Sequence, residues 1–308
     1  MRGVSVRTRF APSPTGDLHL GGALTALASH WLARSAPKGG QTLLRVEDLD
    51  RPRVVAGAEA RQEEDLAWLG LDWDLGPYRQ SERLDEYERA LRQLGALGRT
   101  YPCDCSRAEI ARVASAPHEG EEVVYPGTCR DLPPERELRR APAWRLRVET
   151  SDVVAWTDGV RGPVEPGLVR AGGDFVLRRG DGVFAYQLAV AVDDLVMGIT
   201  AVVRGDDLVA STPRQLLLMK LLAGSERLPE YWHLPLVRAA DGTRLAKRTP
   251  GSTVRDLRAR GHSAERVVGQ LAHALGLVPS SQPMSVDDLV RSVPAGTPFA
   301  KTAWRIPA

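Results

Sequence analysis

A strand, a proline-rich loop and a glycine-containing helix start follow one another at the N-terminus, and this order constrains the fold most. Residues 4–10 alternate in polarity as a strand does, and residues 11–17 (APSPTGD) contain too much proline for a helix or a central strand. From Gly22, apolar side chains recur at helical spacing and predict a helix to about Ser35. Units of this kind build a parallel sheet covered by helices.

The same alternation continues along the chain and predicts an α/β fold. Residues 42–47 are the next predicted strand, residues 57–69 a helix, and a further helix follows with Ser81 as its N-cap. The pattern resumes at residues 183–192, which we interpret as a strand, and it ends with a helix over residues 264–275.

Composition divides the chain into four segments. Residues 99–182 contain all three cysteines, several prolines and short β-like runs, which favours an α+β domain inserted into the α/β pattern. The two halves of the main domain are then residues 1–98 and 183–236, and residues 237–308 are a final segment. The end of that segment carries proline and serine and predicts a loosely held tail.

The composition also bears on the class of protein. The 308 residues are 43% hydrophobic and 26% charged, and the net charge is only +2, which excludes a basic coat or tail as the main means of binding a partner. No apolar run approaches the ~18 residues of a membrane-spanning helix, and the N-terminus has no apolar signal segment. The three cysteines argue against a disulfide framework. We therefore expect a cytoplasmic protein without a membrane partner.

The sequence LHLGG at residues 18–22 opens the first predicted helix and favours a nucleotide site. Gly21 and Gly22 let the backbone approach a phosphate, the helix N-terminus offers free N–H groups, and His19 adds a hydrogen-bonding side chain. A tight turn from strand to helix is an equal alternative for this segment alone. It is not a Walker loop, because no Gly-Lys-Ser/Thr follows.

A second candidate is the basic loop TRLAKR at residues 243–248. Lysine is a compact cation suited to charge that develops on a reacting phosphate, which makes Lys247 a candidate catalytic group. A solvated basic loop is the alternative when this segment is taken by itself.

Together the two segments resemble the HIGH and KMSKS signatures of class I aminoacyl-tRNA synthetases. The resemblance to the glutamyl-tRNA synthetase catalytic core covers about residues 4–275 and is carried by residues 9–16, 45–50, 186–194, 204–208 and 211–215. It implies a Rossmann-like parallel sheet with an inserted α+β domain. Gly22 replaces the second histidine of HIGH and Ala246 the serine of KMSKS. These departures keep open a catalytically silent paralogue that binds RNA or glutamate.

The resemblance implies roles for individual residues. For L-glutamate it implies carboxylate-binding Arg9 and Arg204, ammonium-binding Glu47, the hydroxyl donor Tyr186, and the loop residues Phe10, Ala11, Pro12 and Ser13. For ATP, with Mg²⁺ accompanying it, the resemblance implies His19, Gly21, Gly22, Arg244 and Lys247. His19 and Lys247 are then the catalytic pair that stabilises phosphate charge. Structural ion pairs at the arginines and at Glu47, and a core tyrosine at position 186, are the alternatives.

The chain ends soon after the helix predicted at residues 264–275, so we expect no anticodon-binding domain. In this the sequence resembles the glutamyl-Q tRNA(Asp) synthetase family. The resemblance implies ATP-dependent activation of L-glutamate without tRNA, and transfer to queuosine in the anticodon stem-loop of tRNA(Asp). We expect a monomer. A glutamyl-tRNA synthetase with its anticodon module in another chain, and transfer to a different acceptor, stay open.

Cys103, Cys105 and Cys129 lie in the inserted segment and favour a structural zinc ion. Such an ion needs four ligands, and three thiols are available. Residue chemistry alone favours His118 as the fourth ligand, whereas the family resemblance implies Tyr125, which we choose because a bound cation promotes loss of the phenol proton. Three reduced thiols without a metal are the alternative.

Two further groups of charged residues have no fixed role at this stage. Six arginines of the inserted segment are candidates for RNA-backbone contacts, with a solvated charged face as the alternative: Arg130, Arg136, Arg139, Arg140, Arg145 and Arg147. Asp193 and Asp194, expected on opposite faces of a strand, are interpreted as structural or close to RNA and not as a metal pair.

Overall fold

The computed structural model describes residues 5–113, 124–164, 173–225, 228–238, 242 and 251–304. Its centre is a parallel sheet in two parts. In the first part β2 (Gly40–Val46) pairs with both β1 (Val6–Phe10) and β3 (Leu75–Arg79). The α/β fold predicted from the sequence is confirmed.

The second part of the sheet is built from the later half of the chain. Here β10 (Glu230–Leu234) lies in parallel between β9 (Ala201–Gly205) and β6 (Trp156–Asp158), and β7 (Gly162–Val164) is antiparallel to β6. The two parts meet where the backbone N–H of Thr200 donates to the carbonyl oxygen of Arg7 at 2.9 Å.

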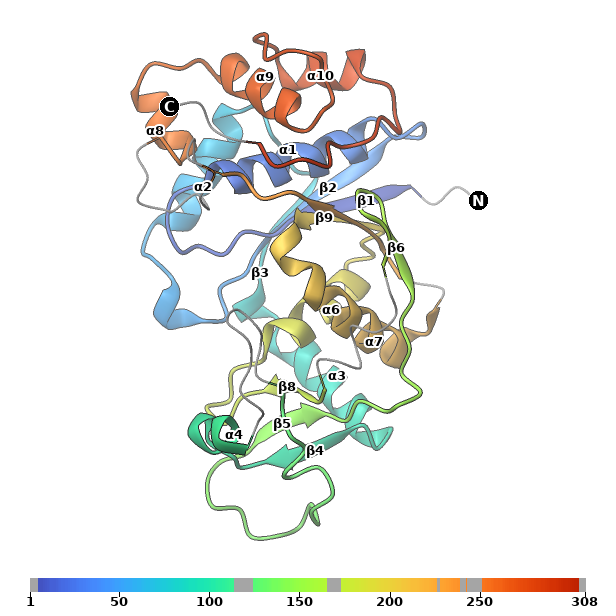
Figure 1. Ribbon diagram of the computed structural model, residues 1–308. Coiled ribbons are helices and arrows are strands. Elements are labelled where there is room, and N and C mark those ends of the chain that lie inside the picture. The colour runs from blue at the N-terminus through green and yellow to red at the C-terminus, as the bar shows by residue number, and fades with distance from the viewer. Residues whose placement is uncertain are drawn as a thin grey trace.

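Helices cover both faces of this sheet (Figure 1). Leu43 and Leu44 are neighbours on β2, yet they are buried in two separate apolar clusters, because successive side chains of a strand point to opposite faces. On the face of Leu44 lie α1 (Leu20–Arg34), α2 (Ala58–Trp68), α8 (Val254–Ala259), α9 (Ala264–Ala274) and α10 (Val286–Ser292). On the face of Leu43 lie α3 (Leu84–Ala96), α6 (Tyr186–Val196) and α7 (Thr212–Ala223).

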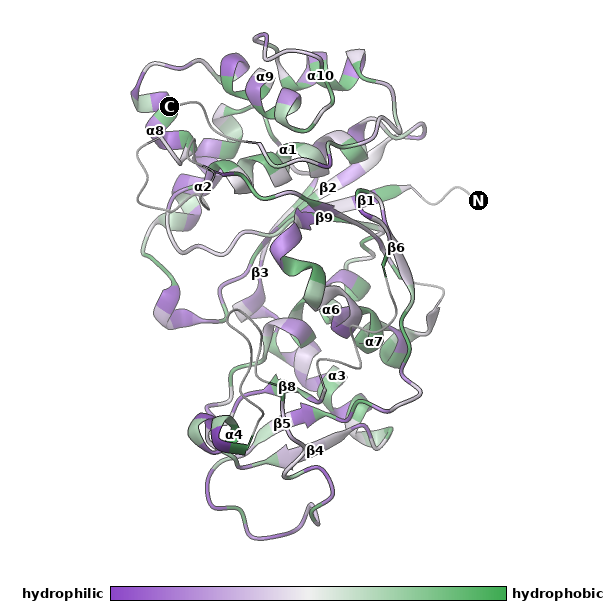
Figure 2. Cartoon of the chain, viewed as in Figure 1, coloured by the Kyte–Doolittle hydropathy of each residue, from purple (hydrophilic) through white to green (hydrophobic). Residues whose placement is uncertain are grey.

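The inserted segment forms a smaller unit at one end of the molecule, below α3 in Figure 1. Its antiparallel sheet consists of β4 (Thr100–Cys103), β5 (Ala143–Leu146) and β8 (Phe175–Arg178), with α4 (Arg107–Val113) beside it. Figure 2 shows many hydrophilic residues on the loops of this unit.

One range predicted for the inserted domain does not belong to its sheet. Residues 156–164 form β6 and β7, and β6 pairs with β10 of the parallel sheet. The chain therefore leaves the parallel sheet, returns to it and leaves it again before α6. The division into residues 1–98, 99–182, 183–236 and 237–308 stays a prediction.

The strand predicted at residues 183–192 is wrong, because most of this range belongs to helix α6. The run VFAYQLAVAV is apolar apart from Tyr186 and Gln187, and periodicity does not distinguish a buried strand from a buried helix in such a run. Leu188, Ala189, Val190 and Ala191 are all fully buried. Ser81 is also not the N-cap of α3, since its hydroxyl donates to Asp48 at 2.6 Å.

The loosely held tail predicted at the C-terminus is wrong for residues 285–304. Ser285 and Asp288 form a capping box that starts α10, a local signal that sequence analysis missed. Leu289 of this helix is fully buried, and the ring of Phe299 packs edge to face on Trp31 of α1 at 5.5 Å between centroids. The segment thus completes the core above α1. Among the described residues, no helix is long and apolar enough to cross a membrane.

Replacing Leu289 with alanine tests this packing. Leu289→Ala leaves a cavity beneath α10, and we expect it to lower the free energy of unfolding by about 3 kcal/mol. Urea denaturation followed by circular dichroism measures the loss. Leu97→Ala removes the same atoms from a leucine that is 53% exposed, and its effect should stay within about 0.5 kcal/mol. Equal effects of the two variants would show that α10 does not contribute to the core.

Candidate active site

Two cavities lie beside the loop that follows β1. The first has a volume of about 610 Å³ and the second about 670 Å³, and Ser13 lines both. Among the residues predicted for glutamate and ATP, the first cavity is lined by Phe10, Ala11, Pro12, Ser13, His19, Gly21, Gly22 and Arg204. Glu47 and Tyr186 line the second. The structure therefore brings together most of a set chosen from separate parts of the sequence.

His19 is the N-cap of α1 and sits at the mouth of the first cavity. Its backbone is extended (φ −78°, ψ 148°), and its Nδ1 accepts a hydrogen bond from the backbone N–H of Gly21 at 3.1 Å. The ring is thereby held at the positive end of the helix dipole. Gly21 and Gly22 leave this end free of side chains, and a Cβ at Gly22 would lie 3.1 Å from Leu18.

Arg244 and Lys247 lie outside the described residues, but both flanks of their loop reach the first cavity. Val237, before the loop, lines it. After the loop, the backbone N–H of Leu20 donates to the carbonyl of Ser252 at 2.9 Å, and that of Val254 donates to the carbonyl of Leu18 at 2.9 Å. The segment after the loop is thus bonded to the strand-to-helix turn that carries His19.

Arg204 projects from β9 and is almost completely buried, with only neutral groups as hydrogen-bond partners. Its Nε donates to Nε2 of His233 at 3.0 Å, Nη1 to the amide oxygen of Gln215 at 2.7 Å, and Nη2 to the hydroxyl of Thr212 at 2.7 Å. Within the described residues no carboxylate forms an ion pair with it. Its positive charge is therefore available to a bound anion.

Arg9 has a different environment. Its Nε contacts a carboxylate oxygen of Asp194 at 3.2 Å, and Nη1 donates to the carbonyl of Val203 at 3.4 Å. Arg9 is buried and is not among the residues that line either cavity. The structural ion pair weighed as an alternative is present, and within the described part of the chain Nη2 has no hydrogen-bond partner.

Glu47 and Tyr186 both line the second cavity. Burial raises the pKa of Glu47, and the guanidinium groups of Arg45 and Arg9 offset part of that rise. Glu47 also contacts Arg45 at 3.3 Å, so the structural ion pair considered as the alternative for Glu47 is present. Burial and the nearby Glu47 carboxylate raise the pKa of Tyr186, which keeps its phenol protonated as a hydrogen-bond donor.

A buried charge cluster lies behind these residues. Arg45 is fully buried and contacts Asp194 at 2.6 Å and Asp193 at 3.7 Å. Burial opposes its charge, but the carboxylates of Asp194, Asp193 and Glu47 outweigh that effect and raise the pKa of Arg45. Asp193 also accepts from the hydroxyl of Tyr87 at 2.9 Å. The structural interpretation of Asp193 and Asp194 is correct, although they lie on a helix.

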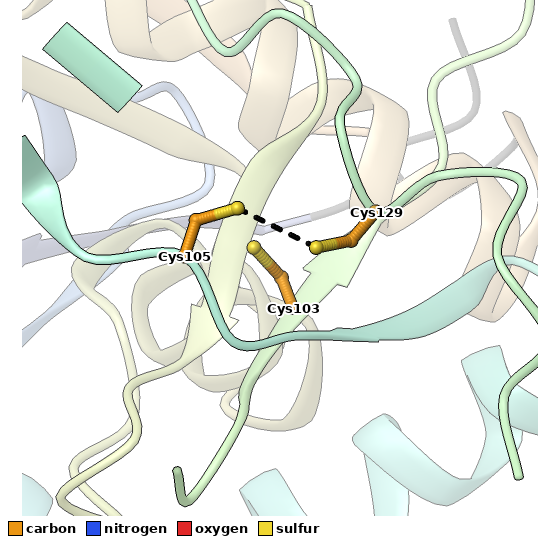
Figure 3. A group of neighbouring side chains, drawn as sticks. All are labelled: Cys103, Cys105 and Cys129. Atoms are coloured by element: carbon orange, nitrogen blue, oxygen red, sulfur yellow. Dashed lines mark hydrogen bonds between the residues drawn. The ribbon is translucent and has the colours of Figure 1, made fainter. Parts of the chain in front are cut away.

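The three cysteines converge in the inserted unit, and Figure 3 shows their sulfur atoms pointing toward one another. All three sulfurs lie within 4.8 Å of each other, and the hydroxyl of Tyr125 is 3.3 Å from Sγ of Cys103 and 3.9 Å from that of Cys105. Four ligands at the ordinary Zn–S distance of about 2.3 Å lie about 3.8 Å apart in a tetrahedron. The donor set fits zinc, and His118 lies outside the described residues.

The six arginines predicted to contact RNA already have partners. Five of them form ion pairs with nearby carboxylates: Arg130, Arg136, Arg139, Arg140 and Arg147. The guanidinium of Arg145 lies 3.7 Å from the centre of the Tyr125 ring. These contacts order the loops around the cysteines, and the contact with RNA stays a prediction.

Comparison with known proteins identifies the class. The family model described as tRNA synthetases class I (E and Q), catalytic domain, matches residues 5–282, so the chain belongs to the class I tRNA synthetases. A solved glutamate tRNA ligase from Elizabethkingia meningosepticum, in complex with its amino acid, superposes with a TM-score of 0.83 and 27% identity. That match covers 99% of this chain and 68% of the ligase.

Within the class, the chain belongs to the glutamyl-Q tRNA(Asp) synthetase family. The protein of that name from Symbiobacterium thermophilum is 48% identical over 92% of this chain and 90% of its own length. Its namesake from Nocardia farcinica is 50% identical over 88% of this chain and 85% of its own length.

Three residues around Arg204 and Arg9 were missed by sequence analysis: Arg45, Asp158 and His233. Arg45 lies in a stretch that carried the family resemblance, but its sequence neighbourhood does not show that it is fully buried. His233 lies in a short strand and has no local signal. Its partners come from β6 and β9, so only the tertiary structure identifies it.

The charge cluster predicts a large effect of removing its cation. Arg45→Ala would leave Asp193 and Asp194 buried with fewer cations, and we expect the free energy of unfolding to fall by about 3–5 kcal/mol. Denaturant titration measures this. Arg53→Ala is the matched control, because Arg53 pairs with Asp50 at 3.9 Å while its side chain is 71% exposed, and such pairs contribute at most about 1 kcal/mol. If the free energy of unfolding falls by an equally small amount in both variants, the cluster does not stabilise the fold.

Proposed function

We propose that this protein activates L-glutamate with ATP, without tRNA, and transfers the glutamyl group to queuosine in the anticodon of tRNA(Asp). The observation that carries the proposal is one cavity lined both by Arg204, which has no carboxylate partner among the described residues, and by His19 at the start of α1. An anionic amino acid and a phosphate are the ligands that suit these two groups. The names of the relatives support glutamate and queuosine.

Glutamate is proposed to bind beside Ser13, which lines both cavities. Arg204 receives one of its carboxylates, and Nη2 of Arg9 assists from behind the loop formed by Phe10, Ala11, Pro12 and Ser13. The carboxylate of Glu47 receives the ammonium group, and the hydroxyl of Tyr186 donates to the substrate. The proximity of Glu47, Tyr186 and both arginines, each of which influences the titration of Tyr186, supports this arrangement.

ATP is proposed to lie along the first cavity, with its phosphates at the start of α1. His19 and the backbone N–H of Gly22 receive the phosphates there, while the N–H of Gly21 holds the His19 ring through Nδ1. Arg244 and Lys247 reach them from the basic loop, whose flanks are bonded to residues 18–20 or line the cavity. Mg²⁺ accompanies ATP as in other phosphoryl-group reactions.

The reaction then needs position and charge stabilisation more than a protein nucleophile. An α-carboxylate oxygen of glutamate attacks the α-phosphorus of ATP. The bond between this phosphorus and the oxygen that bridges the α- and β-phosphates breaks, and pyrophosphate leaves. A hydroxyl of the acceptor nucleoside next attacks the carbonyl carbon of the mixed anhydride, and AMP leaves. The second cavity is lined in part by residues of the inserted unit, among them Cys105 and Arg145, which supports entry of that nucleoside from the side of this unit.

Two assays test this function. Glutamate-dependent exchange of pyrophosphate into ATP should proceed without any tRNA, because all the proposed activating groups lie in this chain. Lys247→Ala should lower kcat by roughly 10²–10³-fold, as loss of one group that stabilises phosphate charge does. In the second assay, radiolabelled glutamate should attach to queuosine-bearing tRNA(Asp) and not to tRNA(Glu).

The outcomes separate the alternatives. Charging of tRNA(Glu) at the higher rate would make the protein a glutamyl-tRNA synthetase that works with an anticodon module elsewhere. Absence of exchange in the wild-type protein would support the silent paralogue. Exchange without transfer to either tRNA would show a different acceptor. tRNA(Asp) from a strain without queuosine is the matched control for the nucleoside.

We further propose that Cys103, Cys105, Cys129 and the phenolate oxygen of Tyr125 hold one structural zinc ion. Elemental analysis of protein purified without chelator should give about one zinc per chain. Cys129→Ser should lose the metal and loosen the inserted unit, while Ser106→Ala, next to Cys105 but without a ligand atom in the group, should keep it. A metal-free wild-type protein would contradict the site.

We also infer that the enzyme acts as a monomer in the cytoplasm, where ATP and tRNA are present.

A further inference from the structure

We propose that His233, held by Asp158, is a positioning residue that orients the guanidinium of Arg204 toward the carboxylate of the amino acid substrate. The inference rests on the proposed function only in taking Arg204 as the group that binds this carboxylate. It adds two residues, neither of which lines either cavity.

The three side chains form a continuous chain across neighbouring strands. Asp158 is at the end of β6, His233 is on β10, and Arg204 is on β9, in parallel register with His233. Oδ2 of Asp158 is 2.7 Å from Nδ1 of His233, and Nε of Arg204 is 3.0 Å from Nε2 of the same ring. Arg204 and His233 are in-register neighbours on parallel strands and point to the same face of the sheet, whereas Asp158 is in register with Tyr231 and reaches His233 from the end of β6.

The hydrogen bonds determine which ring nitrogen carries the proton. Arginine has no acceptor, so Nε2 of His233 must offer its lone pair to the Nε–H of Arg204. Nδ1 then carries the hydrogen and donates to Asp158. Burial lowers the pKa of His233, and the positive charges of Arg204 and Arg161 add to that effect against the Asp158 carboxylate. The neutral ring with its proton on Nδ1 is therefore the state that fits the site.

The packing around the ring leaves it little freedom. His233 and Asp158 have fully buried side chains. The ring of Tyr231 is nearly parallel to that of His233 at 6.0 Å, and Trp156 meets it edge to face at 5.4 Å. Asp158 also accepts from the backbone N–H groups of Val160 and Arg161 at 2.9 Å each, which fixes the carboxylate in its turn.

A neutral partner for Arg204 has a functional consequence. A carboxylate in direct contact would compete with the substrate for the guanidinium, as Asp194 does for Arg9. An imidazole acceptor fixes the orientation of the guanidinium while leaving its charge to the ligand. Asp158 stabilises the arrangement through the ring of His233, which lies between it and Arg204. It does not form an ion pair with Arg204.

Two substitutions of His233 separate its bond to Arg204 from its bond to Asp158; Nε2 also lies 3.1 Å from the hydroxyl of Thr212. His233→Gln can place an amide oxygen near the position of Nε2, so Arg204 keeps an acceptor. His233→Asn can place an amide N–H near Nδ1 and keep the bond to Asp158, but it leaves Nε of Arg204 without a partner. In the exchange assay we expect the asparagine variant to raise KM for glutamate at least about tenfold, and the glutamine variant to stay within about threefold of wild type.

Asp158→Asn tests the proton on the ring. Its amide can donate to Nδ1, which moves the ring hydrogen to Nε2, where it faces the N–H of Arg204. We expect this variant to raise KM for glutamate as His233→Asn does. In all these variants KM for ATP should stay within about twofold of wild type, because the chain of bonds does not reach the start of α1. A general loss of structure would raise KM for glutamate and KM for ATP together.

The matched control is His30→Asn, the same substitution at a buried histidine of α1 that contacts the carbonyl oxygen of Asp72 at 3.3 Å. It should leave KM for glutamate unchanged, and thermal melting should show how folded each variant is. Equal KM values for glutamate in His233→Asn, His233→Gln and wild type would overturn the positioning role. So would a parallel rise in KM for ATP.

Arg204→Ala distinguishes failure of this inference from failure of the proposed function. A rise in KM for glutamate in Arg204→Ala, with none in His233→Asn, overturns the role of His233 and leaves the assignment of Arg204 in place. Unchanged use of glutamate by Arg204→Ala overturns the assignment of Arg204, and the positioning role with it. The inference is supported if KM for glutamate stays near the wild-type value in His233→Gln and rises in His233→Asn.

Discussion

The structure depends on the buried contacts that Arg45 makes with Asp193 and Asp194. Arg45 lies on β2 in the first half of the chain, and the two aspartates lie on α6 after the inserted unit. Separately, each of these groups would be a charge without water and would destabilise the fold. Together, with Tyr87 of α3 and Arg9 of β1 as further partners, they join both halves of the main domain at one point. The walls of the two cavities are fixed to this point.

The two arginines proposed to bind carboxylates illustrate how the same residue type obtains different properties. Arg9 is partly neutralised by Asp194, whereas Arg204 is surrounded by an imidazole, an amide and a hydroxyl. The first joins β1 to α6 and β9 through Asp194 and the carbonyl of Val203, and the second is well suited to attract a ligand. A pocket with two unneutralised arginines would be harder to fold, because each buried charge without a partner destabilises the protein.

Sequence reasoning predicted well where a local signal exists. The strand, the loop and the start of α1 are encoded within a short segment, and the sites proposed on that segment lie together in the structure. It failed at α6, because an apolar run with few polar residues has no readable period, and at α10, where the capping box was overlooked. The roles of Arg45, Asp158 and His233 depend on which strands lie side by side, and spacing along the chain contains no record of that.

The repeated passage of the chain between the two sheets has a mechanical consequence. After β4 and β5 the polypeptide returns to the parallel sheet as β6 and β7, goes back to the smaller sheet as β8, and enters the main domain again at α6. Units joined by a single linker can move relative to each other. Several chain connections between two units restrict such bending and twisting. The cysteine-bearing unit is attached to the main domain by several passages of the chain and not by a single linker.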